Sequence, residues 1–335
     1  DVFMEKKKMR KKVRFNYFVP YLVNSEDENE NFRWTMKEFV EFFLNHKHED
    51  MNTAVPLGDE IADMEWNTAK YDDKNDIYYF QLSKNRSKNI PSKKKLNHDK
   101  VSLELDEDEY ISEFVLLVYD ARYNILIVQS NYYSLSTSQV QIALSILRQR
   151  VKDFNKESEH DNPRGVYLKP LIDSAMIKKV KKNTIYRRIA VKGADFNMAA
   201  SDEFKNNSVN KAITALKEMN GVSFNIELSM SREKKGKSLD KETVRELMDE
   251  VTEADSAGTN VSMSVTSRAQ ENAALETINL IEPRLTSAIE VVAPDRSTIA
   301  AESLYTNFCE QNYLVEGSRS YRDRASRISG SETES

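Results

Sequence analysis

The chain has 335 residues and a formal net charge of −5, from 49 Lys and Arg against 54 Asp and Glu. This length suits two domains of ordinary size, or one large domain. The acidic balance excludes a globally basic nucleic-acid binder but leaves local basic patches open. Only 8 glycines are present, and the closest two, Gly317 and Gly330, are too far apart for glycine-rich phosphate loops or a nucleophile elbow.

The first part of the chain predicts a mainly antiparallel sheet, because β-branched and aromatic residues gather in short runs separated by polar turns. Two of these runs, 114–120 and 124–129, are continuously apolar and predict a central hairpin covered on both faces. The expected strands are 13–23, 63–71, 76–83, 101–105, 114–120 and 124–129.

Two helices are expected to flank this sheet. Thr35 with Glu38, and Ser136 with Gln139, match the capping box that begins a helix. Apolar residues then recur at helical spacing behind each box. The two helices cover about 35–46 and 136–154.

Residues 155–164 contain no apolar side chain and include Pro163, which predicts a domain boundary. Beyond it, strands and helices alternate, so we expect α+β architecture (mixed α/β) throughout, with two domains at 10–155 and 164–313. The second-domain strands are expected at 165–171, 184–191, 222–230, 260–266, 278–281 and 288–292. Its helices are expected at 173–181, 208–219 (ended by Gly221), 240–253 and 298–312.

Residues 314–335 are expected to form a disordered tail. From Gly317 onward, Tyr321 and Ile328 are the only large apolar residues, too few to bury a core. The arginines here could grip an anion or a partner, but a solvated tail is the favoured interpretation. They are Arg319, Arg322, Arg324 and Arg327.

The single cysteine, Cys309, cannot form an internal disulfide, which fits a reducing cytoplasm. We expect it to be a small buried residue on the last helix. The basic segment 1–12 is followed by no apolar stretch of signal-peptide type. No apolar run approaches the length of a membrane span, so membrane insertion is not expected.

No metal or cofactor site is predicted. His46 and His48 lie beside Glu49 and Asp50, but residues two apart on a helix point to different sides, so a polar helix end is the favoured interpretation. No zinc-finger or zinc-protease spacing is present. The acidic run 106–109 is expected to be a solvated loop.

A divergent Mg²⁺-dependent nuclease is an alternative. Such a core places an acid at one strand and an acid-x-Lys motif on the next. Asp120 ends a strong strand, but the paired strand carries neither acid nor lysine. The motifs Asp72-x-Lys74 and Glu233-x-Lys235 fall in expected turns.

Two basic segments give the strongest functional indication. Residues 84–100 contain seven Lys and Arg against one acid, and residues 178–192 contain seven and no acid. If these segments shared a face they would suit contact with a phosphate backbone. Base-specific reading is not predicted, because no helix-turn-helix, RNP or zinc-finger signature is present. The candidate binding residues are Lys84, Arg86, Lys88, Lys93, Lys94, Lys95, Lys178, Lys179, Lys181, Lys182, Arg187 and Arg188.

Several segments together resemble an uncharacterised bacterial family that carries only a "domain of unknown function" label. The resemblance spans about residues 10–312 and implies a phage-linked or mobile-element setting, but it brings no functional residues. The segments are VRFNYFVPYLV at 13–23, NIPSKKKLN at 89–97, LELDEDEYISE at 103–113, VLLVYDARYNILIVQSN at 115–131, GVYLKPLID at 165–173 and SLDKETVRELMDE at 238–250.

The favoured hypothesis is therefore a non-enzymatic cytoplasmic protein that binds DNA or RNA backbone, or a protein partner, within a bacterial anti-phage or mobile-element system. A divergent nuclease and a structural, oligomer-forming protein remain the alternatives.

Overall fold

The computed structural model describes residues 10–24, 31–157, 164–173, 175–194, 223–230, 234, 236–256, 261–281, 283–292, 298–317 and 320–331. They form a mixed α+β fold dominated by strands, which confirms the predicted class. The chain separates into two compact units, one from 1–171 with 285–335 and one from 172–284. The boundary predicted over 155–164 differs from this division, because the next strand after it still pairs within the first unit.

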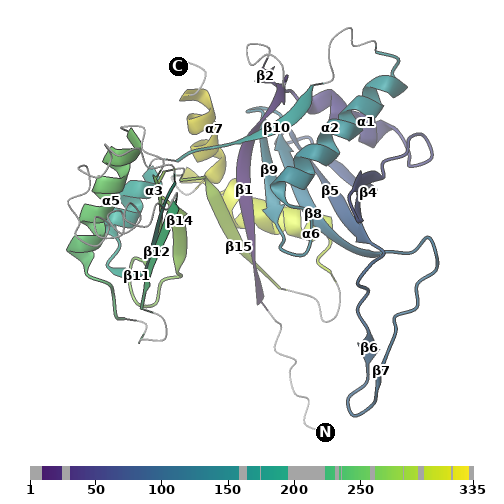
Figure 1. The fold of residues 1–335 in the computed structure, drawn as a ribbon. Helices are drawn as coiled ribbons and strands as arrows, with labels where there is room; N and C mark the ends of the chain where they lie inside the picture. The colour runs from purple at the N-terminus through teal and green to yellow at the C-terminus, as the bar shows by residue number, and fades with distance from the viewer. Residues whose placement is uncertain are drawn as a thin grey trace. The chain divides into compact units, whose positions relative to one another are not determined.

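The first unit is built on a nine-stranded sheet in which every pairing is antiparallel, as predicted. The strand order is β10-β1-β9-β8-β5-β4-β3, and β15 and β2 pair additionally with β1 (Figure 1). The strands are β1 (Arg10–Val23), β2 (Phe32–Arg33), β3 (Val55–Leu57), β4 (Glu60–Asp72), β5 (Ile77–Arg86), β8 (Ile111–Asp120), β9 (Ile125–Ser130), β10 (Gly165–Pro170) and β15 (Thr286–Val292).

Helices cover both faces of this sheet. Along β8, Val115 and Leu117 belong to the core shared with α1 and α2, whereas Leu116 and Val118 belong to the core shared with α6 and α7. This alternation confirms the predicted central hairpin, because all four side chains are fully buried. The helices are α1 (Lys37–Asn45), α2 (Thr137–Phe154), α6 (Ala301–Phe308), the π-helical turn η3 (Cys309–Tyr313) and α7 (Tyr321–Ser331).

The two predicted capping boxes have different outcomes. At α2, the Ser136 hydroxyl accepts from the backbone N–H of Gln139 and the Gln139 side chain accepts from the backbone N–H of Ser136, so this box is confirmed. At α1, Met36 is the N-cap and no side chain caps the helix, so the box of Thr35 and Glu38 is wrong. Met36 is fully buried, and its N–H is instead satisfied by the Tyr119 hydroxyl at 3.1 Å.

The confirmed cap gives a stability prediction. Ser136→Ala should lower the free energy of unfolding by about 1 kcal/mol, because a backbone N–H at the start of α2 loses its acceptor. Thermal unfolding followed by circular dichroism measures the effect. Ser138→Ala, at an exposed position of the same helical turn, is the matched control and should cost nothing. Equal stability of the two variants would contradict the role of the cap.

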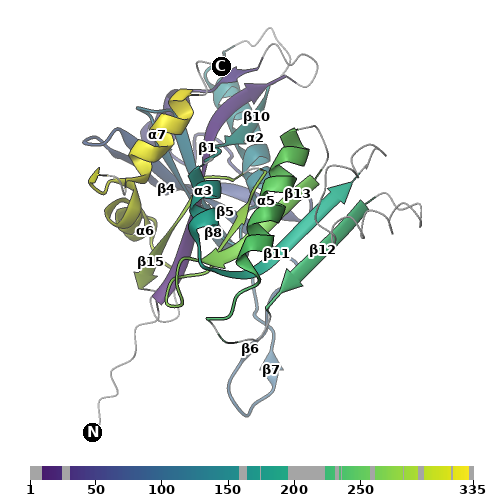
Figure 2. The same cartoon turned by 90° about the vertical axis from the view of Figure 1, so that its left-hand side faces the viewer.

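The second unit is a four-stranded antiparallel sheet in the order β12-β11-β13-β14 (Figure 2). Its two described helices share one core with the sheet, in which Val180 of α3 and Met248 of α5 are buried with Met263 of β13. The predicted helix 208–219 and Gly221 lie outside the described residues. The elements are α3 (Ala175–Lys182), β11 (Ile185–Ala194), β12 (Ser223–Ser229), α5 (Lys241–Ser256), β13 (Val261–Arg268) and β14 (Glu276–Asn279).

The chain leaves the first unit and returns to it at one point. Leu285 donates its backbone N–H to the carbonyl of Leu171 at 2.7 Å. Both leucines are fully buried in the core beneath β1. The segment 172–284 is thus inserted between two residues of the first unit that touch each other.

Residues 87–110, here called the arm, connect β5 to β8 and project away from the first-unit sheet (Figures 1 and 2). Within the arm only β6 (Lys93–Lys94) and β7 (Lys100–Val101) pair with each other. The predicted strand 101–105 is therefore wrong beyond its first residue. Polar and charged residues dominate this part of the chain, so it has too little apolar surface to pack on the sheet.

The predicted disordered tail is wrong over residues 321–331, which form helix α7. Ala325 is fully buried in the core beneath β1, and Tyr321 and Ile328 pack against that core. Few apolar residues suffice here because a buried ion pair adds to them, as described below. Across the described residues, no helix is long and apolar enough to cross a membrane.

Candidate nucleic-acid interface

The two basic segments fall in different compact units, 84–100 in the first and 178–192 in the second. In the second unit, neighbouring acids and carbonyls engage most of the charge, while Lys178 and Lys182 are exposed on α3. Such exposed ion pairs add little to the stability of the protein. Each acid nevertheless offsets a positive charge that would otherwise be available to bind a phosphate. Lys179 pairs with Glu276, Lys181 with Asp249 and Arg188 with Glu227, and Arg187 donates to the carbonyls of Lys234 and Lys237.

Two basic residues at the root of the arm, where it leaves β5, are also paired with acids. Lys84 lies on β5 with its ammonium 2.9 Å from a carboxylate oxygen of Glu60, and its side chain is only 17% exposed. Lys88, the first basic residue of the arm, contacts Asp59 at 2.5 Å. Arg86 is half-buried at the end of β5, opposite Ile111 in register. Lys84 and Lys88 therefore already face acids of β4 and of the turn before it.

The tip of the arm differs from its root. Lys93, Lys94 and Lys95 are exposed, and no acid among the described residues pairs with them. A turn closes the tip where His98 donates its N–H to the Lys95 carbonyl, which leaves Leu96 91% exposed. Three adjacent ammonium groups thus stand on a projecting hairpin.

A second feature of the first unit was missed by the sequence patterns. A pocket of about 330 Å³ opens where β9 ends and α2 begins. Asn16 of β1 is among the residues that line it, together with Gln129, Asn131, Ser134 and Ser136, and none of the described lining residues is charged. This volume lies at the lower end of the range of small-ligand pockets.

Exposed aromatic and basic side chains surround that pocket. Tyr132 is 93% exposed and Tyr133 69%, with their rings edge to face at 5.3 Å. Every second side chain of β1 lies on the same face of the sheet, so Lys12 and Arg14 share the face of Asn16. In the sequence, this surface could have been found from the adjacent Tyr132 and Tyr133 between a strand and a helix cap. The basic residues at every second position of the neighbouring strand are the other indication.

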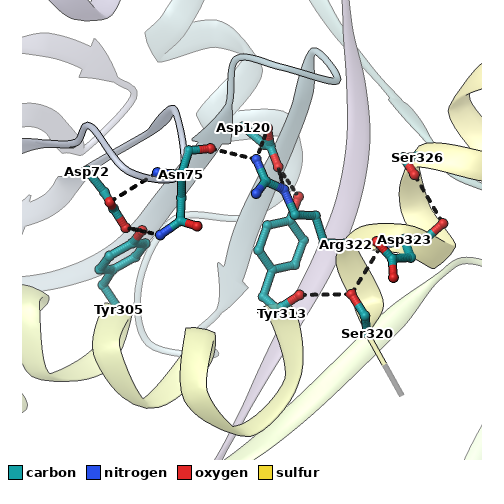
Figure 3. Close-up of polar contacts among 9 residues, drawn as sticks. All are labelled: Asp72, Asn75, Asp120, Tyr305, Tyr313, Ser320, Arg322, Asp323 and Ser326. Atoms are coloured by element: carbon teal, nitrogen blue, oxygen red, sulfur yellow. Dashed lines mark hydrogen bonds and ion pairs between the residues drawn. The ribbon is translucent and has the colours of Figure 1, made fainter. Parts of the chain in front are cut away.

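A buried ionic cluster anchors α7 to the first unit (Figure 3). Arg322 donates to both carboxylate oxygens of Asp120, at 2.7 and 3.1 Å, and to the carbonyl of Asn75 at 2.6 Å. Tyr313 donates to the same carboxylate at 2.9 Å. Asp120 is fully buried and Arg322 nearly so, so the cluster is a structural contact sealed from solvent.

The protonation states in this cluster follow from its geometry. Burial by itself lowers the pKa of Arg322, but the hydrogen bonds and charge of Asp120 outweigh it and the pKa is raised. Burial, followed by the charge of Asp120, raises the pKa of Tyr313 well above its ordinary value. Arg322 is therefore charged and Tyr313 neutral across the physiological range.

The acids considered for a nuclease are engaged by protein groups. Asp120 is bound as described, and Asp72 accepts hydrogen bonds from Tyr305 at 2.7 Å and from Asn75 at 2.9 Å. Glu233 and Lys235 lie outside the described residues. Among the residues that are described, no three His, Cys, Asp or Glu gather as a metal site.

His46 packs against the aromatic rings of its own helix and of α2 rather than beside other ligands. Its ring stacks on Phe42 and meets Phe154 edge-on. His48 instead lies 3.2 Å from Glu49 at the surface. A polar helix end, as predicted, describes this region.

Cys309 is buried at the start of η3, as predicted. Burial raises the pKa of its thiol to about 12. This folded-state pKa exceeds the ordinary thiol value of about 8.5. The contribution of the protonated thiol to the stability of the folded state is therefore fully present below about pH 8.5. The contribution is lost as the pH rises toward the folded pKa.

The thiol should accordingly react slowly in the native protein. At about pH 8 we expect alkylation of Cys309 to be on the order of 1,000-fold slower than in the urea-unfolded chain, because thiolate is the nucleophile. Mass spectrometry of iodoacetamide-treated protein measures the rate, and the unfolded sample is the internal control. Comparable rates in both samples would show that the thiol is accessible.

Together, the fold and the site define an α+β protein with an inserted second unit and a first-unit sheet that carries an arm with three adjacent lysines near its tip. The chain belongs to a family of unknown function (DUF6731), whose model matches residues 8–324. The predicted resemblance to an uncharacterised family is thus confirmed. No curated protein matches the chain.

Proposed function

We propose that this protein binds nucleic-acid backbone without catalysing a reaction, and that the tip of the arm makes the contact. The observation that carries the proposal is the cluster of Lys93, Lys94 and Lys95, exposed and without acidic partners among the described residues. In the second unit, by contrast, Lys179, Lys181 and Arg188 are paired with acids.

The shape of the arm supports this proposal. A two-stranded β-ribbon fits the major groove of a duplex and can equally follow a single strand. Each ammonium that neutralises a phosphate releases condensed counterions, so affinity arises without sequence recognition. Lys12 and Arg14 on β1 of the same unit add exposed positive charge, and one acid, Glu290, lies opposite Lys12 in register.

The acidic run 106–109 limits which part of the arm can approach a phosphate. It forms a turn in which Glu109 donates its N–H to the Asp106 carbonyl, close to the start of β8. Like-charge repulsion with phosphate is therefore strongest near the root. The backbone would meet the arm at its tip.

The test is the salt dependence of binding by the full chain. Fluorescence anisotropy with labelled DNA of about 20 nucleotides, as single strand and as duplex, should show binding at about 50 mM salt. Three phosphate contacts predict that log K falls with log salt with a slope of about −2 to −3. Absence of binding to DNA and to RNA at this salt would refute the proposal.

A protein partner, or a second copy of the chain, is the second candidate. Leu96 at 91% and Val101 at 53% exposure place apolar surface on the arm, and basic and acidic residues are separated along it. Light scattering of the nucleic-acid-free protein tests self-association. The anti-phage or mobile-element setting stays a prediction, which gene neighbourhood would test.

A further inference from the structure

We infer that the Tyr132–Tyr133 loop and its pocket form a stacking site for unpaired nucleobases, which makes single-stranded nucleic acid the preferred ligand. The inference rests on the proposed function and goes beyond backbone contact. Aromatic platforms next to positive charge are the general means by which proteins hold single strands, because every base has a face that can stack.

The loop holds its aromatic rings outward by hydrogen bonds to the neighbouring strand. The Ser134 hydroxyl donates to the Glu113 carbonyl at 2.9 Å, and the Asn131 amide donates to the Phe114 carbonyl at 3.0 Å. Asn131 also accepts from the backbone N–H of Tyr133. Two rings on a fixed loop lose little freedom when a base stacks on them, which favours binding.

The pocket offers the hydrogen-bonding groups that a base edge needs. Asn16, Ser130 and Thr137, which carry amide and hydroxyl groups, are among the lining residues, together with Tyr132. Amides and hydroxyls can each donate and accept, so they can pair with the edges of different bases. None of the described lining residues is charged, which suits a neutral base better than a phosphate.

Cations for the adjoining phosphates lie on β1. Arg14 is directly opposite Ser130 in register, and Lys12 follows on the same face. Both side chains are exposed. One acid lies nearby, Glu290, which is opposite Lys12 and contacts Arg10 at 3.5 Å. Arg14 is therefore the better placed phosphate contact.

The stacking site and the arm tip lie on one continuous path in the first unit. Phe114, which holds the loop, is three residues along β8 from the root of the arm, about 10 Å at the usual strand rise. The arm adds about 26 Å from Ser87 to Lys95. A strand of about ten nucleotides could therefore reach both.

The experiment compares loop variants of the full chain on single-stranded oligothymidine and on duplex DNA, each of about 20 nucleotides. Tyr132→Ala should weaken binding to the single strand about tenfold, whereas duplex binding should stay unchanged because paired bases cannot stack on the loop. Tyr132→Phe keeps the ring and should restore single-strand binding. Ultraviolet crosslinking to bromouracil-substituted oligonucleotide should label Tyr132 or Tyr133.

The outcomes separate the inference from the proposed function. The stacking site is wrong if Tyr132→Ala leaves the affinity for the single strand unchanged while binding stays salt-dependent. It is also wrong if this variant weakens the binding of single strand and duplex equally. In both cases backbone binding stands. If the unaltered protein binds neither ligand, the proposed function itself fails. Since Tyr132 is almost fully exposed, misfolding of the variant is not expected to confuse the result.

Discussion

Replacing Lys93, Lys94 and Lys95 together with Gln should weaken nucleic-acid binding about 100-fold at about 50 mM salt and make the salt slope shallower by about 2 to 3. The three ammonium groups are exposed at the arm tip and unengaged by acids of the described chain. Their loss should be the same for every base sequence, because phosphate contacts carry no sequence information.

A matched control removes the same charge from the second unit. Lys179→Gln, Lys181→Gln and Arg188→Gln together also remove three positive charges, but these side chains already face acids. We expect less than about a threefold change in affinity from this control, since the pairs are largely neutral before substitution. If the control weakens binding more than the arm variant does, the second unit is the interface and the arm is not.

Arg322→Ala should lower the free energy of unfolding by about 3 to 5 kcal/mol. If the rest of the unit stays folded, the same loss should instead appear as local detachment of α7 from the sheet. The substitution leaves the carboxylate of Asp120 buried without its cation, which is the costly way to break an ion pair. Urea denaturation measures the loss. Hydrogen exchange of residues 321–331 tells global destabilisation from local release of the helix.

Two further variants sharpen this prediction. Arg327→Ala is on the same helix, but Arg327 is exposed and donates to the carbonyl of Asp323 on α7 itself. It should change stability by less than about 0.5 kcal/mol. Asp120→Asn combined with Arg322→Met removes both charges and should recover much of the loss. Wild-type stability of Arg322→Ala would mean that α7 is not anchored through this pair.

Strands β1, β4, β5, β8 and β9 of the first unit could be predicted because local patterns specify them, whereas the sequence places β10 and β15 in the second domain, because their pairing with β1 joins residues far apart in the chain. Apolar runs gave the hairpin of β8 and β9, and a local capping box gave the start of α2. The α7 helix could not be predicted in this way, because its stability depends on Asp120, which is 202 residues away in the chain. Charged residues such as Arg322 look solvated until their partner is known.

The candidate site shows the same limit. A run of lysines is visible in the sequence, but whether acids neutralise it depends on pairs such as Lys179 with Glu276, which are distant in the chain. The pocket beside Tyr132 joins β1 to the start of α2, so no single stretch of sequence contains it. Strand alternation does place Lys12 and Arg14 on one face, but only the pairing of β1 with β9 brings them to the loop.

The contact between Leu171 and Leu285 has a consequence for how such a protein can change during evolution. Because the inserted segment begins and ends at residues joined by one backbone hydrogen bond, it occupies the position of a surface turn. Segments attached in this way can be lengthened, exchanged or lost without altering the strand order of the host sheet. Among related chains, the second unit is therefore where size and specificity can diverge most while the arm-bearing sheet stays intact.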